Sequence, residues 1–206
     1  MAMTDPWPPI KGFLPSTMID WDGKLAAEVF LPGCNFRCPF CHASGLVLRP
    51  QELPTIPFQA VADHLRANDG WFDGVVVSGG EPTLHPGLAD FIAALRELAP
   101  AVKLDTNGTH PEVVERLIAD GLIEAVALDV KAPLDGRYAR ACGAEADLEA
   151  VGATIDLLRA SGIEHEFRTT VVPGIHEPRD IVIIAQRLGE GERLVLQQFA
   201  PLECLD

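Results

Sequence analysis

The amino-acid sequence predicts an α/β fold in which parallel strands alternate with helices around one core. Six short β-rich runs are followed by helical stretches, which is the pattern of repeated βα units. The 206 residues, of which 48% are hydrophobic, suffice for one well-buried domain. No linker or low-complexity tract divides the chain, so we expect residues 1–206 to form a single domain.

The predicted strands are runs of β-branched and aliphatic residues. They cover residues 27–33, 74–80, 101–108, 125–132, 164–174 and 193–199. Before the first run, "TMIDWDGKLAAEVF" (17–30) predicts a β-hairpin that turns at Asp22–Gly23, because Asp-Gly favours the tight turns of hairpins. The expected sheet therefore consists of an N-terminal hairpin and six strands.

Helices are predicted where apolar side chains recur every three or four positions. These segments cover residues 88–98, 113–118, 148–158 and 181–188. Pro111 and Pro178 stand where two of the helices should begin, since proline fits the first turn of a helix. Gly121, Gly162 and Gly189 stand where helices should end, since glycine readily adopts the left-handed conformation of a C-cap.

Composition and charge exclude several classes of function. The net charge is −14 and the sixteen basic residues are scattered, which argues against a nucleic-acid-binding surface. No stretch has the roughly 20 apolar residues of a membrane span, and the N-terminus lacks a signal-peptide pattern. We therefore expect a soluble, cytoplasmic protein without nucleic-acid or membrane partners. In that reducing compartment, clustered cysteines favour metal binding or redox chemistry over disulfides.

Polar and glycine residues gather at the ends of the predicted strands. Such βα units form either an open doubly wound sheet or an incomplete barrel, and both place functional groups at the carboxyl ends of their strands. Five strand ends carry these residues, namely "CNFRCPFC" (34–41), "SGGEP" (78–82), "DTNG" (105–108), "DVK" (129–131) and "RTTVVPG" (168–174). Taken alone, several have a structural explanation as a helix cap, a turn or an ion pair. Their recurrence on successive strands favours one shared site.

Three of the five cysteines fall within eight positions. Cys34, Cys38 and Cys41 have the spacing C-x3-C-x2-C on a loop, and three thiolates leave one coordination position unfilled. His42 could complete a Cys3His zinc site, although adjacent residues seldom both reach one metal. An iron–sulfur cluster with one iron open to a small molecule explains both the missing ligand and the polar rim. Cys142 and Cys204 stand alone and are expected to have no such role.

The cysteine loop "CNFRCPFC" resembles the cluster motif of the radical S-adenosylmethionine (SAM) superfamily, and the resemblance extends along nearly the whole chain. It implies an incomplete (β/α)6 barrel in which the three cysteines hold a [4Fe–4S] cluster and SAM binds beside it. "GGEP" (79–82) is similar to the second motif of this family, which meets the methionine amino group. The residues that this similarity assigns to the cofactor are Ser78, Gly79, Gly80 and Glu81.

Two further motifs resemble the branch of the superfamily that activates glycyl radical enzymes. "LDTNG" and "LDVK" are similar to segments whose asparagine, aspartate and lysine contact SAM in that branch; these are Asn107, Asp129 and Lys131 here. "FRTTVVPG" resembles a late strand of the same branch, which adds Arg168 and Val172 as lesser contacts.

Two longer segments, 12–42 and 197–206, are most similar to activators of anaerobic ribonucleoside-triphosphate reductase. The chain departs from those relatives after the third cysteine, where it has "CHAS" (41–44) in place of the common "CHNP". It also lacks a second set of cysteines, so the resemblance implies an external low-potential electron donor such as flavodoxin or ferredoxin.

Side-chain chemistry agrees with several of these assignments. Phe40 could pack near the adenine of SAM or shield the cluster. Asp129 and Lys131 are two apart on a predicted strand and should share one face, where buried charges need partners. The polar residues that alternate along 164–170 fit a polar barrel interior and a solvent-facing strand about equally well.

The resemblance implies an enzyme that splits SAM to methionine and a 5′-deoxyadenosyl radical, which takes hydrogen from a backbone glycine of a partner. A six-unit barrel is open at its side, so its cleft should admit an extended loop of such a partner. One alternative within the superfamily is a small-molecule enzyme similar to 7-carboxy-7-deazaguanine synthase. An alternative from another class is a noncatalytic zinc or iron–sulfur module.

Overall fold

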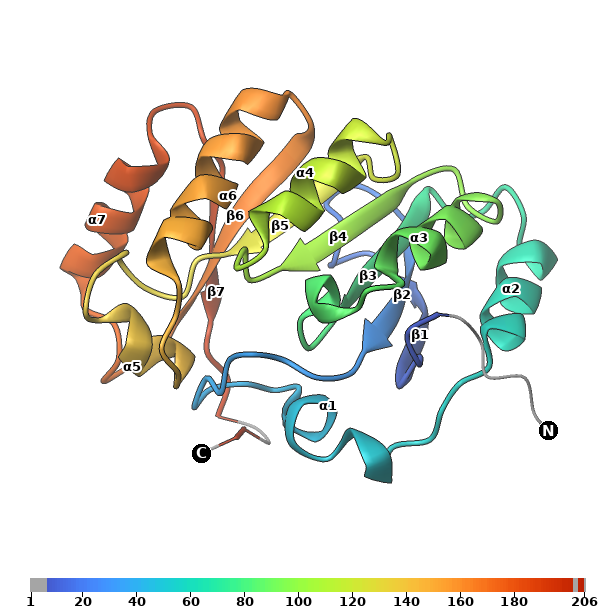
Figure 1. Cartoon of the computed structure of the whole chain (residues 1–206), viewed down its shortest axis with the longest axis horizontal. Coiled ribbons are helices and arrows are strands. Elements are labelled where there is room, and N and C mark those ends of the chain that lie inside the picture. The colour runs from blue at the N-terminus through green and yellow to red at the C-terminus, as the bar shows by residue number, and fades with distance from the viewer. Residues whose placement is uncertain (1–6, 202–203, 206) are drawn as a thin grey trace.

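The computed structural model describes residues 7–201 and 204–205, and its centre is one curved sheet of seven strands (Figure 1). The strands are β1 (Gly12–Thr17), β2 (Ala26–Leu31), β3 (Gly74–Gly79), β4 (Val102–Thr106), β5 (Ala125–Asp129), β6 (Glu164–Val171) and β7 (Leu194–Gln198). They lie side by side in chain order, with β1 antiparallel to β2 and every later pair parallel. Because β1 and β7 form the two edges, the barrel is incomplete, as the family resemblance implies.

The N-terminal hairpin forms with its first strand earlier than predicted. β1 ends at Thr17, where the predicted hairpin sequence begins, and Thr17 pairs with Ala26 of β2. The turn lies at Asp22–Gly23 as predicted, since the Lys24 N–H donates to the Trp21 carbonyl at 3.0 Å.

Seven α-helices and two short 3-10 helices connect the strands within the described residues. They are α1 (Ser44–Leu48), η1 (Pro50–Glu52), α2 (Phe58–Ala67), η2 (Pro82–Leu84), α3 (Leu88–Arg96), α4 (Pro111–Ala119), α5 (Tyr138–Cys142), α6 (Leu148–Ser161) and α7 (Pro178–Leu188). The four predicted helices correspond to α3, α4, α6 and α7, and they lie along one face of the sheet (Figure 1). None of the helices described is both long and apolar enough to span a membrane.

The helix boundaries follow the predicted proline and glycine signals. α4 and α7 begin at Pro111 and Pro178, and α6 and α7 are capped by Gly162 and Gly189. Gly121 follows the C-cap of α4 by one residue and has a φ of +64°. The sequence prediction lacked α1, α2 and α5. α1 and α5 are only five residues long, whereas α2 was overlooked although Phe58, Val61 and Leu65 have helical spacing.

The strands all end somewhat sooner than predicted, and β5 and β6 fall furthest short, because side chains bond to the backbone N–H groups that follow them. β5 ends at Asp129, and the Lys131 N–H donates to the Tyr138 hydroxyl at 3.3 Å. β6 ends at Val171, after which the Val172 N–H donates to Nδ1 of His176 at 3.0 Å. The prediction that Asp129 and Lys131 share a strand was therefore wrong for Lys131, which lies in the connection after β5.

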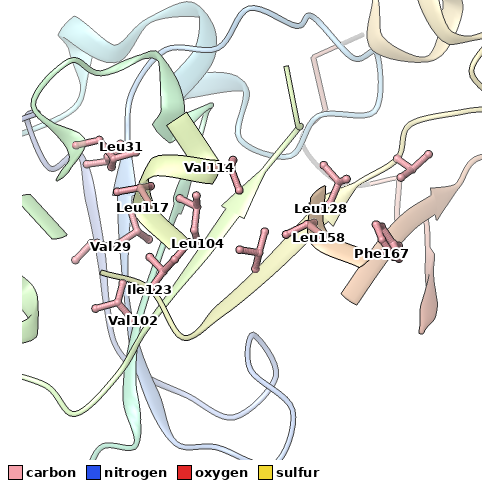
Figure 2. Close-up of a cluster of buried hydrophobic side chains, with 14 of the residues drawn as sticks. Val29, Leu31, Val102, Leu104, Val114, Leu117, Ile123, Leu128, Leu158 and Phe167 are labelled. Atoms are coloured by element: carbon pink, nitrogen blue, oxygen red, sulfur yellow. The ribbon is translucent and has the colours of Figure 1, made fainter. Parts of the chain in front are cut away.

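The hydrophobic core lies between the sheet and its covering helices. Figure 2 shows apolar side chains of the strands packed against those of the helices, and all of the labelled ones are at most 5% exposed. The labelled side chains are Val29, Leu31, Val102, Leu104, Val114, Leu117, Ile123, Leu128, Leu158 and Phe167. This layer fixes the strand positions, and hence the loops at the carboxyl ends of the strands.

The opposite face of the sheet encloses a charged barrel interior. Lys103 is 2% exposed, and its Nζ lies 3.1 Å from Oε1 of Glu166 and 3.6 Å from Oδ1 of Asp105. Burial, followed by repulsion from Asp20 and Asp105, raises the pKa of Glu28 to about 8. Of the two alternatives for 164–170, the structure therefore supports the polar interior at Glu166, whereas Glu164 is exposed.

Candidate functional site

A pocket of about 190 Å³ lies at the carboxyl ends of the strands. It brings together residues in the last part of five different strands or directly after them, as the sequence predicts for a parallel sheet. The predicted site residues that line it are Cys34, Cys38, Phe40, Cys41, Ser78, Gly79, Gly80, Asn107, Asp129, Lys131 and Arg168. Glu81 and Val172 are not among the described residues that line this pocket.

The cysteine loop follows β2 and presents all three predicted thiols to the pocket. Burial raises the pKa of Cys38 to about 12 and also raises the pKa of Cys34. A buried thiolate is therefore disfavoured without a positive partner, which a metal supplies. Among the described residues, no three or more His, Cys, Asp or Glu side chains have the geometry of a single-ion site.

Contacts from distant segments fix the shape of the cysteine loop. The Arg37 N–H donates to the Cys142 carbonyl of α5 at 2.8 Å. The His42 ring stacks on Phe199 at 6.0 Å between centroids, and its Nε2 lies 2.8 Å from the Ala200 carbonyl oxygen. Figure 1 shows the C-terminal end of the described chain beside this loop. The loop is therefore held in its middle and at its C-terminal end.

The glycine pair after β3 allows the cysteine loop to approach the sheet. A Cβ on Gly80 would lie 1.8 Å from the Gly33 carbonyl oxygen, and one on Gly79 would lie 2.3 Å from the Leu31 carbonyl oxygen. Gly79 also has a φ of +119°, which disfavours residues other than glycine. The Glu81 N–H donates to the Gly33 carbonyl at 2.7 Å. The pair thus joins the end of β3 to the residue before Cys34.

The Glu81 side chain turns into the protein. It is fully buried, and its Oε1 accepts hydrogen bonds from the Thr83 N–H at 3.1 Å and from the hydroxyls of Thr83 and Thr106. Its Oε2 accepts from the Asn107 N–H at 2.6 Å. Glu81 therefore anchors the connection between β4 and α4, and a direct contact of this carboxylate with a bound molecule stays a prediction.

Four charges meet at the ends of β4, β5 and β6. Arg168 lies 2.9 Å from both Asp129 and Asp105, and the Lys131 Nζ lies 3.0 Å from Oδ2 of Asp129. Burial alone would raise the pKa of Asp129, but Arg168 and then Lys131 hold it well below its usual range. Burial alone would lower the pKa of Lys131, but Asp129 and then Cys38 together raise it above its ordinary value. The pocket therefore contains two basic and two acidic side chains, and burial raises the pKa of one of the acids, Asp105.

Asp105 is a pocket residue that the sequence analysis did not single out. Its side chain is buried, and its Oδ1 has no hydrogen-bond partner among the residues that the structure describes. The signal was present, because Lys103, Asp105 and Asn107 alternate along a strand that is otherwise apolar.

His176 was missed as well, because it lies outside the predicted strand ends. Its Nδ1 accepts the Val172 N–H at 3.0 Å, so its Nε2 must carry the proton that is donated to the Lys131 carbonyl at 2.7 Å. Its ring meets the buried Phe40 ring edge-on, with centroids 6.3 Å apart. His176 thus connects the segment after β6 to two pocket residues.

The remaining cysteines lie apart from this arrangement. Cys142 is buried in α5 and its thiol donates to the Ala144 carbonyl at 3.1 Å, while Cys204 is half-buried. Neither is among the described residues that line the pocket.

A family model for the radical SAM superfamily matches residues 29–187, which include every element of the pocket. The chain belongs to the radical SAM superfamily. Members of this superfamily use a [4Fe–4S] cluster and SAM, so these are the cofactors of this chain. Three thiols on one pocket fit such a cluster, because each would hold a different iron and leave the fourth open to a small molecule.

Two relatives and one solved structure show what this chain is similar to. A protein of Methanocaldococcus jannaschii, provisionally named a glycyl-radical enzyme activating enzyme, is 37% identical over 204 residues, covering 96% of this chain and 82% of its own length. A 7-carboxy-7-deazaguanine synthase of Methanopyrus kandleri is 31% identical over 133 residues, covering 55% of this chain and 52% of its own length. SuiB of Streptococcus suis bound to SAM matches the fold with a TM-score of 0.63 at 19% identity, covering 82% of this chain and 39% of SuiB.

Proposed function

We propose that this radical SAM enzyme activates a glycyl radical enzyme by taking hydrogen from a backbone glycine of that partner. The observation that carries the proposal is the 37% identity to the Methanocaldococcus relative, because it covers 96% of this chain and most of the relative. The similarity of residues 12–42 to activators of anaerobic ribonucleoside-triphosphate reductase supports that reductase as the partner.

In this proposal the cysteine loop holds the cluster through Cys34, Cys38 and Cys41. The cluster and SAM together supply a 5′-deoxyadenosyl radical when an electron arrives from a low-potential donor such as flavodoxin or ferredoxin. The chain itself supplies position and charge. Lys131 offers a cation for the methionine carboxylate, and Asp129, held by Arg168, offers a fixed carboxylate for the rest of the cofactor.

The open side of the sheet supports a macromolecular substrate. β1 and β7 are the edge strands of the described sheet and are not paired with each other, which supports entry of an extended loop that carries the glycine. The net charge of −14 favours a basic or neutral docking face on the partner.

The test uses the full chain with its cluster, a low-potential reductant and anaerobic ribonucleotide reductase from the same cell. We expect slow, uncoupled formation of 5′-deoxyadenosine without the reductase and a glycine-centred doublet in electron paramagnetic resonance with it. Deuterium in the glycines of the reductase should appear in 5′-deoxyadenosine. If no protein radical forms and no deuterium is transferred, this partner is wrong.

The second candidate is a small-molecule reaction of the 7-carboxy-7-deazaguanine synthase type. The 31% identity to the Methanopyrus synthase favours it, although the match covers only 55% of this chain. Transfer of deuterium into 5′-deoxyadenosine from a labelled purine or pterin precursor, without a protein radical, would establish this candidate in place of the first.

A further inference from the structure

We infer that Asn35 is a positioning residue for the cluster, because it fastens the cysteine loop to the β4–α4 connection and orients an amide N–H toward the sulfur of Cys34. The inference rests on the proposed role of Cys34 as a cluster ligand, but it does not depend on the substrate or the partner. It assigns a function to a residue between the first two cysteines that the motif itself leaves free.

The side chains of Asn35, Asn107 and Thr109 form a closed set of hydrogen bonds. The Asn107 Nδ2 donates to Oδ1 of Asn35 at 2.8 Å, and the Asn35 Nδ2 donates to the Thr109 hydroxyl at 2.9 Å. Oδ1 of Asn107 accepts from the Thr109 N–H at 3.1 Å and from the Thr109 hydroxyl at 2.7 Å. Both ends of each amide are thus engaged, which fixes the orientation of both side chains.

This arrangement places two N–H groups near the sulfur of Cys34. The Phe36 N–H lies 3.3 Å from this sulfur and the Asn107 Nδ2 lies 3.9 Å from it, while Oδ1 of Asn35 accepts from the free Cys34 thiol at 3.9 Å. Glu81 fixes the main chain of Asn107 through its N–H, while Asn35 fixes the side chain. The position of the second donor therefore depends on Asn35.

Hydrogen bonds to the sulfurs of an iron–sulfur cluster help to set its reduction potential. An N–H directed at a ligand sulfur stabilises the reduced cluster more, because that state carries more negative charge. Loss of Asn35 should therefore shift the potential to a more negative value and make the electron transfer that starts the reaction harder. A contact of Asn107 with SAM alone predicts no such shift in the absence of SAM.

The experiment compares Asn35→Leu and Thr109→Val with the wild-type chain, each carrying its cluster and studied without SAM or partner. Asn35 is exposed, so its replacement leaves the core intact. The matched control is Asn68→Leu, which replaces an asparagine at the C-terminal end of helix α2. Reductive titration followed by electron paramagnetic resonance measures the potential, and iron and sulfide analysis measures the cluster content. We expect a several-fold smaller reduced fraction at a fixed potential in both test variants and no change in the control.

Cluster loss from Asn35→Leu with unchanged circular dichroism would also support the inference, because the loop would then no longer be held. Full clusters with the wild-type potential and spectrum in both test variants would overturn it. Failure to detect a glycyl radical in the partner would leave these measurements unaffected, so the two proposals fail separately.

Discussion

The Arg168 side chain lies directly against Asp129 of the neighbouring strand, with Nε donating to Oδ1 at 2.9 Å. The two residues are register partners in the β5–β6 pair. The other end of the guanidinium lies 2.9 Å from Asp105. Arg168 is thus neutralised by two carboxylates of its own chain, and its effect on a bound cofactor passes through the position of Asp129.

Asp129→Ala, Lys131→Ala and Arg168→Gln should each retain the cluster but bind SAM more weakly. Asp129→Ala and Lys131→Ala each remove a charge-assisted contact with SAM, and Arg168→Gln removes the side chain that holds Asp129. Such a contact contributes roughly 1.5–3 kcal/mol to binding, so its loss should raise the dissociation constant about ten- to a hundred-fold. Anaerobic calorimetry measures the affinity. Asp135→Asn, which alters an exposed ion pair with Arg137, is the control. Wild-type affinity in all three variants would contradict the proposed cofactor site.

Cys34→Ala, Cys38→Ala and Cys41→Ala should each lose nearly all of the absorption of the four-iron cluster, because each removes one of three thiolates on the pocket. Cys142→Ala and Cys204→Ala should keep it. Iron and sulfide analysis after anaerobic purification makes the comparison quantitative. Complete loss of iron from Cys142→Ala would refute the ligand assignment.

Gly80→Ala should destabilise the protein by roughly 1–3 kcal/mol and reduce its cluster content, because the added methyl group collides with the Gly33 carbonyl beside the cysteine loop. Gly136→Ala is the matched control, since a Cβ there meets no atom within 4 Å. Denaturant unfolding and iron analysis test both variants. Equal stability of the two would show that the β3 end and the cysteine loop separate easily.

Glu28→Gln should flatten the dependence of stability on pH. The pKa of Glu28 is raised from 4.5 to about 8 in the folded chain, mainly by burial. The protonated carboxyl therefore contributes stability that is fully present below pH 4.5 and is lost as the pH rises through about 8. Glutamine does not ionise, so the variant should gain up to about 1.4 kcal/mol relative to wild type per pH unit within this window. Urea unfolding at several pH values measures the difference in unfolding free energy. Glu115→Gln, at an exposed position, is the control. Parallel curves of unfolding free energy against pH for Glu28→Gln and wild type would contradict the prediction.

Much of the fold was predictable because its signals are local. Proline at the starts of α4 and α7, glycine at helix ends and the Asp-Gly turn act within a few residues of the chain. The pocket was predictable for a similar reason, since parallel strands bring their carboxyl ends together whatever the details of packing.

The features that could not be predicted depend on contacts between residues that are not neighbours in sequence. Lys131 leaves the strand because of the Tyr138 hydroxyl, and Val172 leaves it because of His176. The inward turn of Glu81 is set by Thr106 and Asn107, 25 and 26 positions away. No periodicity in the sequence encodes these pairings.

The attachments of the cysteine loop also determine when the site can be completed during synthesis. The loop is bound at Gly33 by Glu81, at Arg37 by Cys142 and at His42 by Ala200, the last across 158 positions. The ribosome therefore releases the three thiols long before their final support has been made. We expect the cysteine loop of the nascent chain to be exposed to solvent until then. Iron and sulfide should therefore be inserted after β7 has been synthesised rather than during translation.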